Sequence, residues 1–178
     1  MKWTVLSDNR RCDDSLETEH GLSILLETKK HRILLDTGAS DIFIRNATKM
    51  NIDLGMVDYV FISHGHSDHA GGLKHLMKKI NNAQVIVSPH AINGKFFSKR
   101  GNLHSITAEW PKIDDISTTI SGMSWPYMSM ACCLQAVPIA VWRTFWRLVL
   151  GQFIPLSEVS IYLIAWRQKK NCQLWLKG

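Results

Sequence analysis

The sequence predicts an α/β fold over its first 115 residues, and three observations carry that prediction. Short aliphatic runs recur along the chain and end at polar or glycine residues, as buried strands do. Apolar residues in two of the intervening segments have the spacing of an amphipathic helix. The resulting order of strand, loop, helix and strand is typical of a βαβ unit with parallel strands.

The first elements are expected to be strands. Residues 3–7 form a short apolar run before a polar loop. Residues 22–28 and 33–36 are two further aliphatic runs, separated by the polar residues 29–32. Two short apolar runs around a brief polar connection predict an antiparallel hairpin.

A helix and a buried strand are expected next. Ser40 is placed to cap a helix over residues 41–50, where the apolar residues fall near one face. Residues 57–62 are too short and too continuously apolar for a surface helix, which favours a buried strand. A second helix over residues 72–80 and a strand over residues 84–88 complete the unit.

The segment that follows the strand at residues 57–62 carries the strongest chemical signal. His64, His66, Asp68 and His69 place three imidazoles and a carboxylate within six positions. These groups are ligands that zinc and similar divalent metals accept. The first two histidines can converge on one ion, and the aspartate and the last histidine can address a second. We therefore predict a metal site at the carboxyl end of this strand.

Asp68 is also the predicted catalytic residue. Two divalent ions about 3.5–4 Å apart can share a water and lower its pKa toward about 7. Asp68 is placed to orient that water or to accept its proton. His31, His75 and His104 are expected to be structural or solvated. His90 follows a predicted strand, and a loop at that place can line the same cleft.

Composition and cysteine usage exclude several classes of protein. An apolar content of 46% is ordinary for a folded chain and argues against gross disorder. The four cysteines form neither a disulfide framework nor a paired C-x-x-C spacing. The first residues lack the continuous apolar stretch of a secretory signal. These features predict a cytoplasmic protein.

The character of the chain changes after residue 115. Residues 1–115 carry 15 Lys and Arg against 14 Asp and Glu, a net charge of +1, whereas residues 116–178 carry 6 against 1, a net charge of +5. Five of the seven tryptophans lie in the second segment. We therefore predict a metal-binding domain at 1–115 and a divergent, basic, Trp-rich tail at 116–178. Polar residues and prolines make residues 116–142 a poor membrane-spanning segment.

The motif resembles a known family signature. Residues 63–72, with the order Ser-His-Gly-His-Ser-Asp-His-Ala-Gly-Gly, resemble the H-x-H-x-D-H signature of the metallo-β-lactamase superfamily of hydrolases. Residues 34–38, Leu-Leu-Asp-Thr-Gly, are similar to the strand that precedes this signature, which implies that Asp36 supports the ligands from behind. The resemblance implies an αβ/βα sandwich of two similar halves, with zinc ions between them. Only the first half is recognisable, over roughly residues 1–110.

A narrower resemblance involves two other segments. Residues 5–9 and 19–23 are similar to the dihydropterin phosphate synthase-like subgroup of these hydrolases. This resemblance implies that Glu19 and His20 lie near the mouth of the site.

The second half of the family's ligand set has no counterpart in this chain. The superfamily takes two further histidines and a bridging aspartate from its second half, but residues 116–178 contain neither His nor Asp. Three explanations are open. The tail is an out-of-frame or otherwise aberrant translation, which we favour; or it is a divergent cap on a half-domain that pairs with another subunit; or the four motif residues hold one ion with water. Iron and manganese are alternatives to zinc.

The predicted function is metal-dependent hydrolysis of an ester, phosphoester or related bond in a small anionic substrate. One alternative is a nucleic-acid-processing member of the superfamily, which the net charge of +1 over residues 1–115 disfavours. A redox member with iron usually has an acidic residue in place of a motif histidine, and His66 is intact. Another alternative is a truncated, inactive metal-binding remnant or interaction module. A homo-oligomer is compatible with each of these functions.

Overall fold

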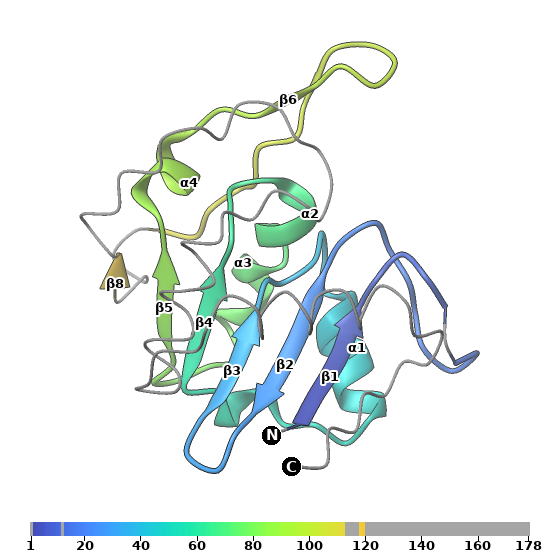
Figure 1. The fold of residues 1–178 in the computed structure, drawn as a ribbon, viewed down its shortest axis with the longest axis vertical. Helices are drawn as coiled ribbons and strands as arrows, with labels where there is room; N and C mark the ends of the chain where they lie inside the picture. Colours follow the sequence, from blue (N-terminus) through green and yellow to red (C-terminus); the bar gives the residue numbers. More distant parts are fainter. Residues whose placement is uncertain (1, 12, 113–117, 120–178) are drawn as a thin grey trace, which may run out of the picture. The chain divides into compact units, whose positions relative to one another are not determined.

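The main sheet has both antiparallel and parallel strands (Figure 1). The computed structural model describes residues 2–11, 13–112 and 118–119. In that part of the chain, the strand order of the sheet is β1-β2-β3-β4-β5-β8. The strands are β1 (Lys2–Ser7), β2 (Ser23–Glu27), β3 (Arg32–Leu35), β4 (Tyr59–Ile62), β5 (Gln84–Val87) and β8 (Thr118–Thr119). From β1 to β3 neighbouring strands are antiparallel, and from β3 to β8 they are parallel. The predicted α/β class is confirmed.

The predicted hairpin of β2 and β3 is confirmed, and its second strand begins and ends one residue earlier than predicted. Leu25 lies opposite Leu34, and Glu27 lies opposite Arg32. The turn is closed by Thr28, whose Oγ1 accepts a hydrogen bond of 2.8 Å from the backbone N–H of His31. The side chain of Arg32 lies 3.4 Å from the Glu27 carboxylate across the two strands, so the strand begins at Arg32 rather than after it.

Short helices connect the parallel strands. They are α1 (Ile42–Lys49), α2 (Ser67–Ala70), α3 (Leu73–Leu76), α4 (Pro89–Asn93) and the 3-10 helix η1 (Leu54–Met56). The N-cap of α1 is Asp41, and the predicted cap Ser40 accepts a 3.2 Å hydrogen bond from Ile42 N–H. The helix predicted at 72–80 ends as α3 at Leu76 because the backbone tightens, with Lys79 N–H donating to the Leu76 carbonyl over 2.7 Å.

The core lies between α1, α3 and one face of the sheet. Its central side chains come from four adjacent strands and from α1, and all are fully buried: Leu25, Leu34, Val60, Val85 and Phe43. Residues of β2 and β3 on the opposite face, such as Leu26 and Ile33, are buried as well. Burial on both faces explains why these strands appear in the sequence as unbroken apolar runs.

A separate two-stranded sheet lies between β5 and the end of the continuously described chain. It pairs β6 (Phe97–Ser98) with β7 (His104–Ser105) in antiparallel fashion. Of the predicted tail at 116–178, only β8 lies within the described residues, where it pairs with β5. The boundary at residue 115 and the fold of the tail therefore stay predictions. No helix in the described part of the chain is both long and apolar enough to span a membrane.

Candidate metal centre

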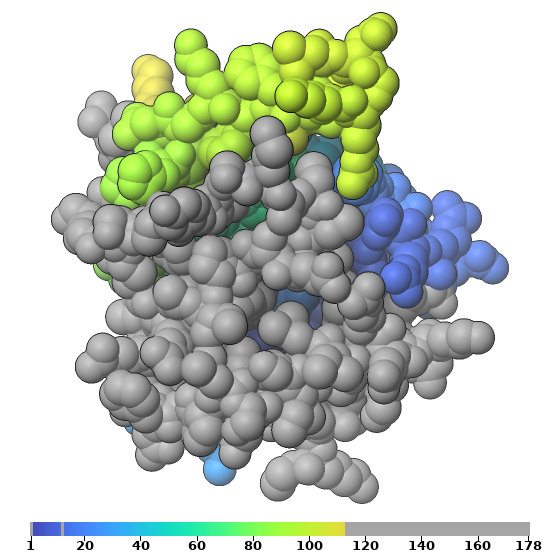
Figure 2. Space-filling view, turned by 45° about the horizontal axis from the view of Figure 1, so that its top comes forward, coloured from blue at the N-terminus to red at the C-terminus, as the bar shows by residue number. Residues whose placement is uncertain are grey.

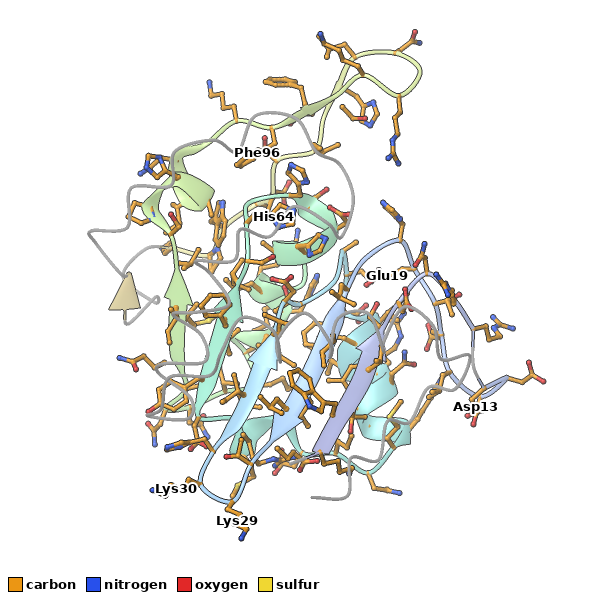
Figure 3. All side chains as sticks on the ribbon, viewed as in Figure 1. Asp13, Glu19, Lys29, Lys30, His64 and Phe96 are labelled. Atoms are coloured by element: carbon orange, nitrogen blue, oxygen red, sulfur yellow. The ribbon has the colours of Figure 1, made fainter. Side chains whose placement is uncertain are left out.

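Three of the four predicted metal ligands cluster at the carboxyl end of β4. The ring centroid of His64 lies 4.4 Å from that of His66 and 4.2 Å from that of His69. Figure 3 shows His64 beyond the end of β4, close to Phe96. All three histidines are partly buried. The sequence pattern therefore corresponds to a group of imidazoles that contact one another in space.

A helical turn lies within the motif, and the sequence analysis did not predict it. This turn is α2, whose N-cap is His66. Ala70 N–H donates to the His66 carbonyl over 2.9 Å, and Thr37 N–H, just after β3, donates to the His69 carbonyl over 2.7 Å. The turn thus brings His69 to the end of β3. Asp68, an acidic residue of the kind favoured in the first turn of a helix, is the signal that could have revealed it.

Asp36 occupies the position expected of a residue that supports the ligands from behind. It follows β3, and only 2% of it is exposed. One carboxylate oxygen, Oδ2, lies 2.7 Å from Nδ1 of His69 and accepts a 2.7 Å hydrogen bond from the Ser63 hydroxyl. The other, Oδ1, accepts the backbone N–H of Ser63 at 2.8 Å. Its backbone is left-handed, with φ of 55°, a conformation that Asp tolerates better than most residues.

Ser63 is a site residue that the sequence analysis did not identify. Its hydroxyl has a single proton, which it donates to Asp36. The same oxygen lies 2.8 Å from Nδ1 of His64, so Nδ1–H of His64 is the donor in that contact. Both His64 and His69 therefore engage Nδ1 with a partner behind them, which leaves the Nε2 lone pair free when the ring is neutral. The only sequence signal was a serine directly before the first histidine.

The titration of the histidines follows from burial and from their neighbours. Burial, together with the neighbouring His69, lowers the pKa of His64 to about 4. Burial likewise lowers the pKa of His66. Burial opposes charge on His69 too, but the charge and hydrogen bond of Asp36, with the charge of Asp68, raise its pKa overall. His64 and His66 are thus neutral near pH 7, the form in which imidazole binds a metal.

Asp68 and His20 lie together at this site. Oδ2 of Asp68 lies 3.8 Å from Nε2 of His69 and 3.4 Å from Nε2 of His20. The His20 side chain is 74% exposed, whereas that of Asp68 is 24% exposed. The structure therefore places His20 beside a predicted catalytic residue and in contact with solvent.

Glu19 and His90 have other surroundings. The Glu19 carboxylate accepts hydrogen bonds from the Ser40 hydroxyl at 2.6 Å and from Ala39 N–H at 3.0 Å, which fixes the loop after β3. His90 is exposed and lies in α4 rather than in the predicted loop. The helix starts there because Ser88 caps it, accepting a hydrogen bond from His90 N–H, and Pro89 occupies its first turn.

Two glycines allow the backbone around the motif to pack closely. A Cβ on Gly72 would lie 2.1 Å from the carbonyl oxygen of Thr37, and one on Gly65 would lie 2.2 Å from that of Ala91. No side chain fits at either distance. These contacts hold the motif against the end of β3 on one side and against α4 on the other.

The residues present fit a divalent metal in donor chemistry. Two neutral imidazoles, His64 and His66, lie beside the His69 ring and the Asp68 carboxylate. Within the described residues, however, no three His, Cys, Asp or Glu side chains have the arrangement of an assembled metal site.

Comparison with known proteins identifies the family. The sequence model of the metallo-beta-lactamase superfamily matches residues 16–122. The chain belongs to this superfamily. Members of the superfamily are in general metal-dependent hydrolases, and the expected fold is confirmed for the part of the chain that the family match covers.

Three relatives show how much of the superfamily fold is matched. A 7,8-dihydropterin-6-methyl-4-(beta-D-ribofuranosyl)-aminobenzene-5'-phosphate synthase of Methanocaldococcus jannaschii is 36% identical over 84 residues, which are 44% of this chain and 29% of that protein. An uncharacterised protein of the same organism is 35% identical over 83 residues, which are 46% of this chain and 32% of that protein. The crystal structure of Tm1679, a metal-dependent hydrolase of the beta-lactamase superfamily, is similar with a TM-score of 0.52 and 34% identity, over 67% of this chain and 41% of that chain.

The resemblance to the dihydropterin synthase-like proteins is thus confirmed for the first part of the chain. The match takes in about a third of the length of each curated relative.

Proposed function

We propose that this chain is a metal-dependent hydrolase that uses water to cleave an ester, phosphoester or related bond in a small anionic substrate. His64, His66, Asp68 and His69 would hold the metal, and zinc is the expected ion. The observation that supports this proposal most is the group of three imidazoles, two of which engage Nδ1 with Ser63 or Asp36 behind them. Such partners are typical of histidines that bind metals.

Each residue of the site has a role in this chemistry. When bound, a divalent metal supplies Lewis acidity, which polarises the scissile group and lowers the pKa of water. Asp36 and Ser63 orient the rings of His69 and His64 so that Nε2 remains available. Asp68 accepts the proton of the attacking water. Exposed His20, 3.4 Å from Asp68, then passes that proton to solvent.

Turnover measured before and after metal removal tests the proposal. The full chain would be assayed with p-nitrophenyl acetate and bis(p-nitrophenyl) phosphate, treated with a chelator, and reloaded with zinc, manganese or iron. We expect activity to disappear with the chelator and to return with metal. Asp68→Asn should lower kcat by about 100-fold or more, because it removes the proton acceptor. It should lower metal content much less, because the three histidines remain as ligands.

Asp13→Asn is the matched control for that substitution. Asp13 lies at the tip of the loop after β1, away from the histidine cluster (Figure 3). The Asp13→Asn variant should retain native activity. Activity that survives chelation, or equal activity in the two variants, would contradict the proposal.

A second candidate function is a metal-binding module without turnover. It is favoured by the lack of His and Asp in residues 116–178, from which the superfamily would draw its remaining ligands. The same assay separates the two candidates, because stable metal binding with no cleavage of either ester would support the module.

A further inference from the structure

A hairpin that the proposed function does not use is joined to the histidine motif at its base. We call residues 95–105, which contain β6 and β7, the arm. Just beyond it, Ser67 N–H donates to the carbonyl of Ile106 over 2.7 Å, and Ala108 N–H donates to that of Gly65 over 2.9 Å. The base of the arm is therefore fixed by backbone hydrogen bonds to the segment that carries the candidate ligands.

Side chains at the base of the arm continue this contact. The ring of Phe96 meets that of His66 edge-on, with centroids 5.0 Å apart. Phe96 N–H donates to the hydroxyl of Thr107 over 2.7 Å, and Thr107 forms an isolated β-bridge with His66. Figure 3 shows Phe96 beside His64. The base of the arm thus contacts His66, one member of the histidine cluster.

All formal charge on the arm is positive. Lys95, Lys99 and Arg100 are exposed, and residues 94–108 contain no Asp or Glu. Within the described part of the chain, none of these three cations forms an ion pair with an acidic side chain. By contrast, Arg45 and Lys74 each pair with a glutamate at 2.7 Å. No acidic side chain among the described residues therefore competes with an anion for these cations.

The arm also exposes two large apolar side chains. Phe97 is 57% exposed and Leu103 is 68% exposed, while Ser98, which follows Phe97 in β6, is only 9% exposed. Figure 2 shows this part of the chain, in yellow-green, at the surface of the face that it displays. Large apolar side chains that remain in water on one short hairpin are candidates for a binding surface.

We propose that the arm recognises the substrate, and that the substrate is a small molecule with a negatively charged group and an aromatic or similarly flat apolar group. Lys99 and Arg100 bind the charged group, while Phe97 and Leu103 pack against the apolar group. This proposal rests on the proposed function, because recognition by the arm assumes that the histidine cluster acts on the bound molecule.

Kinetics with two esters of p-nitrophenol test the role of Lys99 and Arg100. p-Nitrophenyl phosphate is an anion, and p-nitrophenyl acetate is neutral. The double variant Lys99→Gln/Arg100→Gln should raise KM for the phosphate by about 10-fold, because two charge-assisted contacts are lost. KM for the acetate should rise far less. Similar rises for both esters would overturn the proposal.

A matched variant controls for net charge. Lys29→Gln/Lys30→Gln also removes two exposed positive charges, but from the turn between β2 and β3, at the end of the sheet opposite His64 (Figure 3). It should leave KM for both esters unchanged. A rise in KM for the phosphate equal to that of the Lys99→Gln/Arg100→Gln variant would show a general effect of charge and would overturn the proposal.

Binding of phenyl phosphate separates failure of the arm from failure of the hydrolase. Amide shifts of the full chain would be followed by NMR as phenyl phosphate or inorganic phosphate is added. Arm-dependent binding of phenyl phosphate without cleavage of any ester would support the arm and contradict only the hydrolase. Phe97→Ala should weaken the binding of phenyl phosphate more than the binding of inorganic phosphate. An oligonucleotide would be titrated in the same way. The proposal would be overturned if the native chain bound no phenyl phosphate, or if the arm bound the oligonucleotide and not phenyl phosphate.

Discussion

At the scale of single residues, the orientation of the histidine cluster depends on one buried carboxylate. Asp36 accepts hydrogen bonds from His69 and from the Ser63 hydroxyl, and that hydroxyl accepts one from His64. A neutral imidazole can carry its proton on either nitrogen, and the partner of one nitrogen decides which. Through the Ser63 hydroxyl, Asp36 therefore also helps to fix the orientation and tautomer of His64, a second candidate ligand.

Removal of the Ser63 hydroxyl should weaken metal binding. In Ser63→Ala, His64 loses the acceptor for Nδ1–H, so the affinity for zinc should fall by about 10-fold. Competition with a chromophoric chelator would measure this affinity. Imidazole ¹⁵N shifts of the metal-free protein would report the loss of a fixed Nδ1–H tautomer.

Ser63→Thr keeps the hydroxyl and is the matched control. It should retain a near-native affinity and the native tautomer of His64. If the alanine and threonine variants lose affinity equally, the hydroxyl is not what matters at this position, and packing around Ser63 accounts for the effect.

At the scale of secondary structure elements, Asn46 joins α1 to the first strand and to the loop that carries His20. Its Nδ2 donates to the carbonyls of Leu6 and Glu17, both at 2.8 Å, and its Oδ1 accepts Glu17 N–H at 2.9 Å. Only 2% of the residue is exposed. One buried amide thus bonds three backbone groups of two other segments.

Asn46→Ala should lower the free energy of unfolding by about 2 kcal/mol, since it removes the three hydrogen bonds of a buried amide. Thr48→Ala, at an exposed position of the same helix, should change the free energy of unfolding by less than about 0.5 kcal/mol. Urea unfolding of the two variants beside the native chain measures the difference. Equal stability of the two variants would contradict the structural role of the amide.

The strands were more predictable than the helices or the contacts behind the site. β4 and β5 are continuous apolar runs, and such runs have few alternatives in a short segment. α4 replaces the loop expected at His90, because Ser88, the last residue of the strand predicted at 84–88, caps a helix that Pro89 begins. The contacts of Ser63 and Asn46 join residues 27 and 40 positions apart, and no local pattern predicts such pairs.

At the scale of the whole molecule, the parallel part of the sheet gathers the candidate chemistry at one edge. β3, β4 and β5 run in the same direction, so Asp36, the histidine motif and α4 all follow carboxyl ends of strands (Figure 1). This is where open α/β sheets usually bind ligands. The βαβ pattern and the motif predicted this edge from the sequence, but the arm beside it required the structure.

The central claim is that His64 and His66 hold a metal, and the metal content of the purified full chain tests it most directly. Elemental analysis would compare the native chain with His64→Ala, His66→Ala and His75→Ala, the last in α3 and outside the cluster. We expect about one metal ion or more per native chain and per His75→Ala chain, and little metal in the other two variants. Equal metal content in all four proteins, or no metal in a native chain purified without chelator, would contradict the claim.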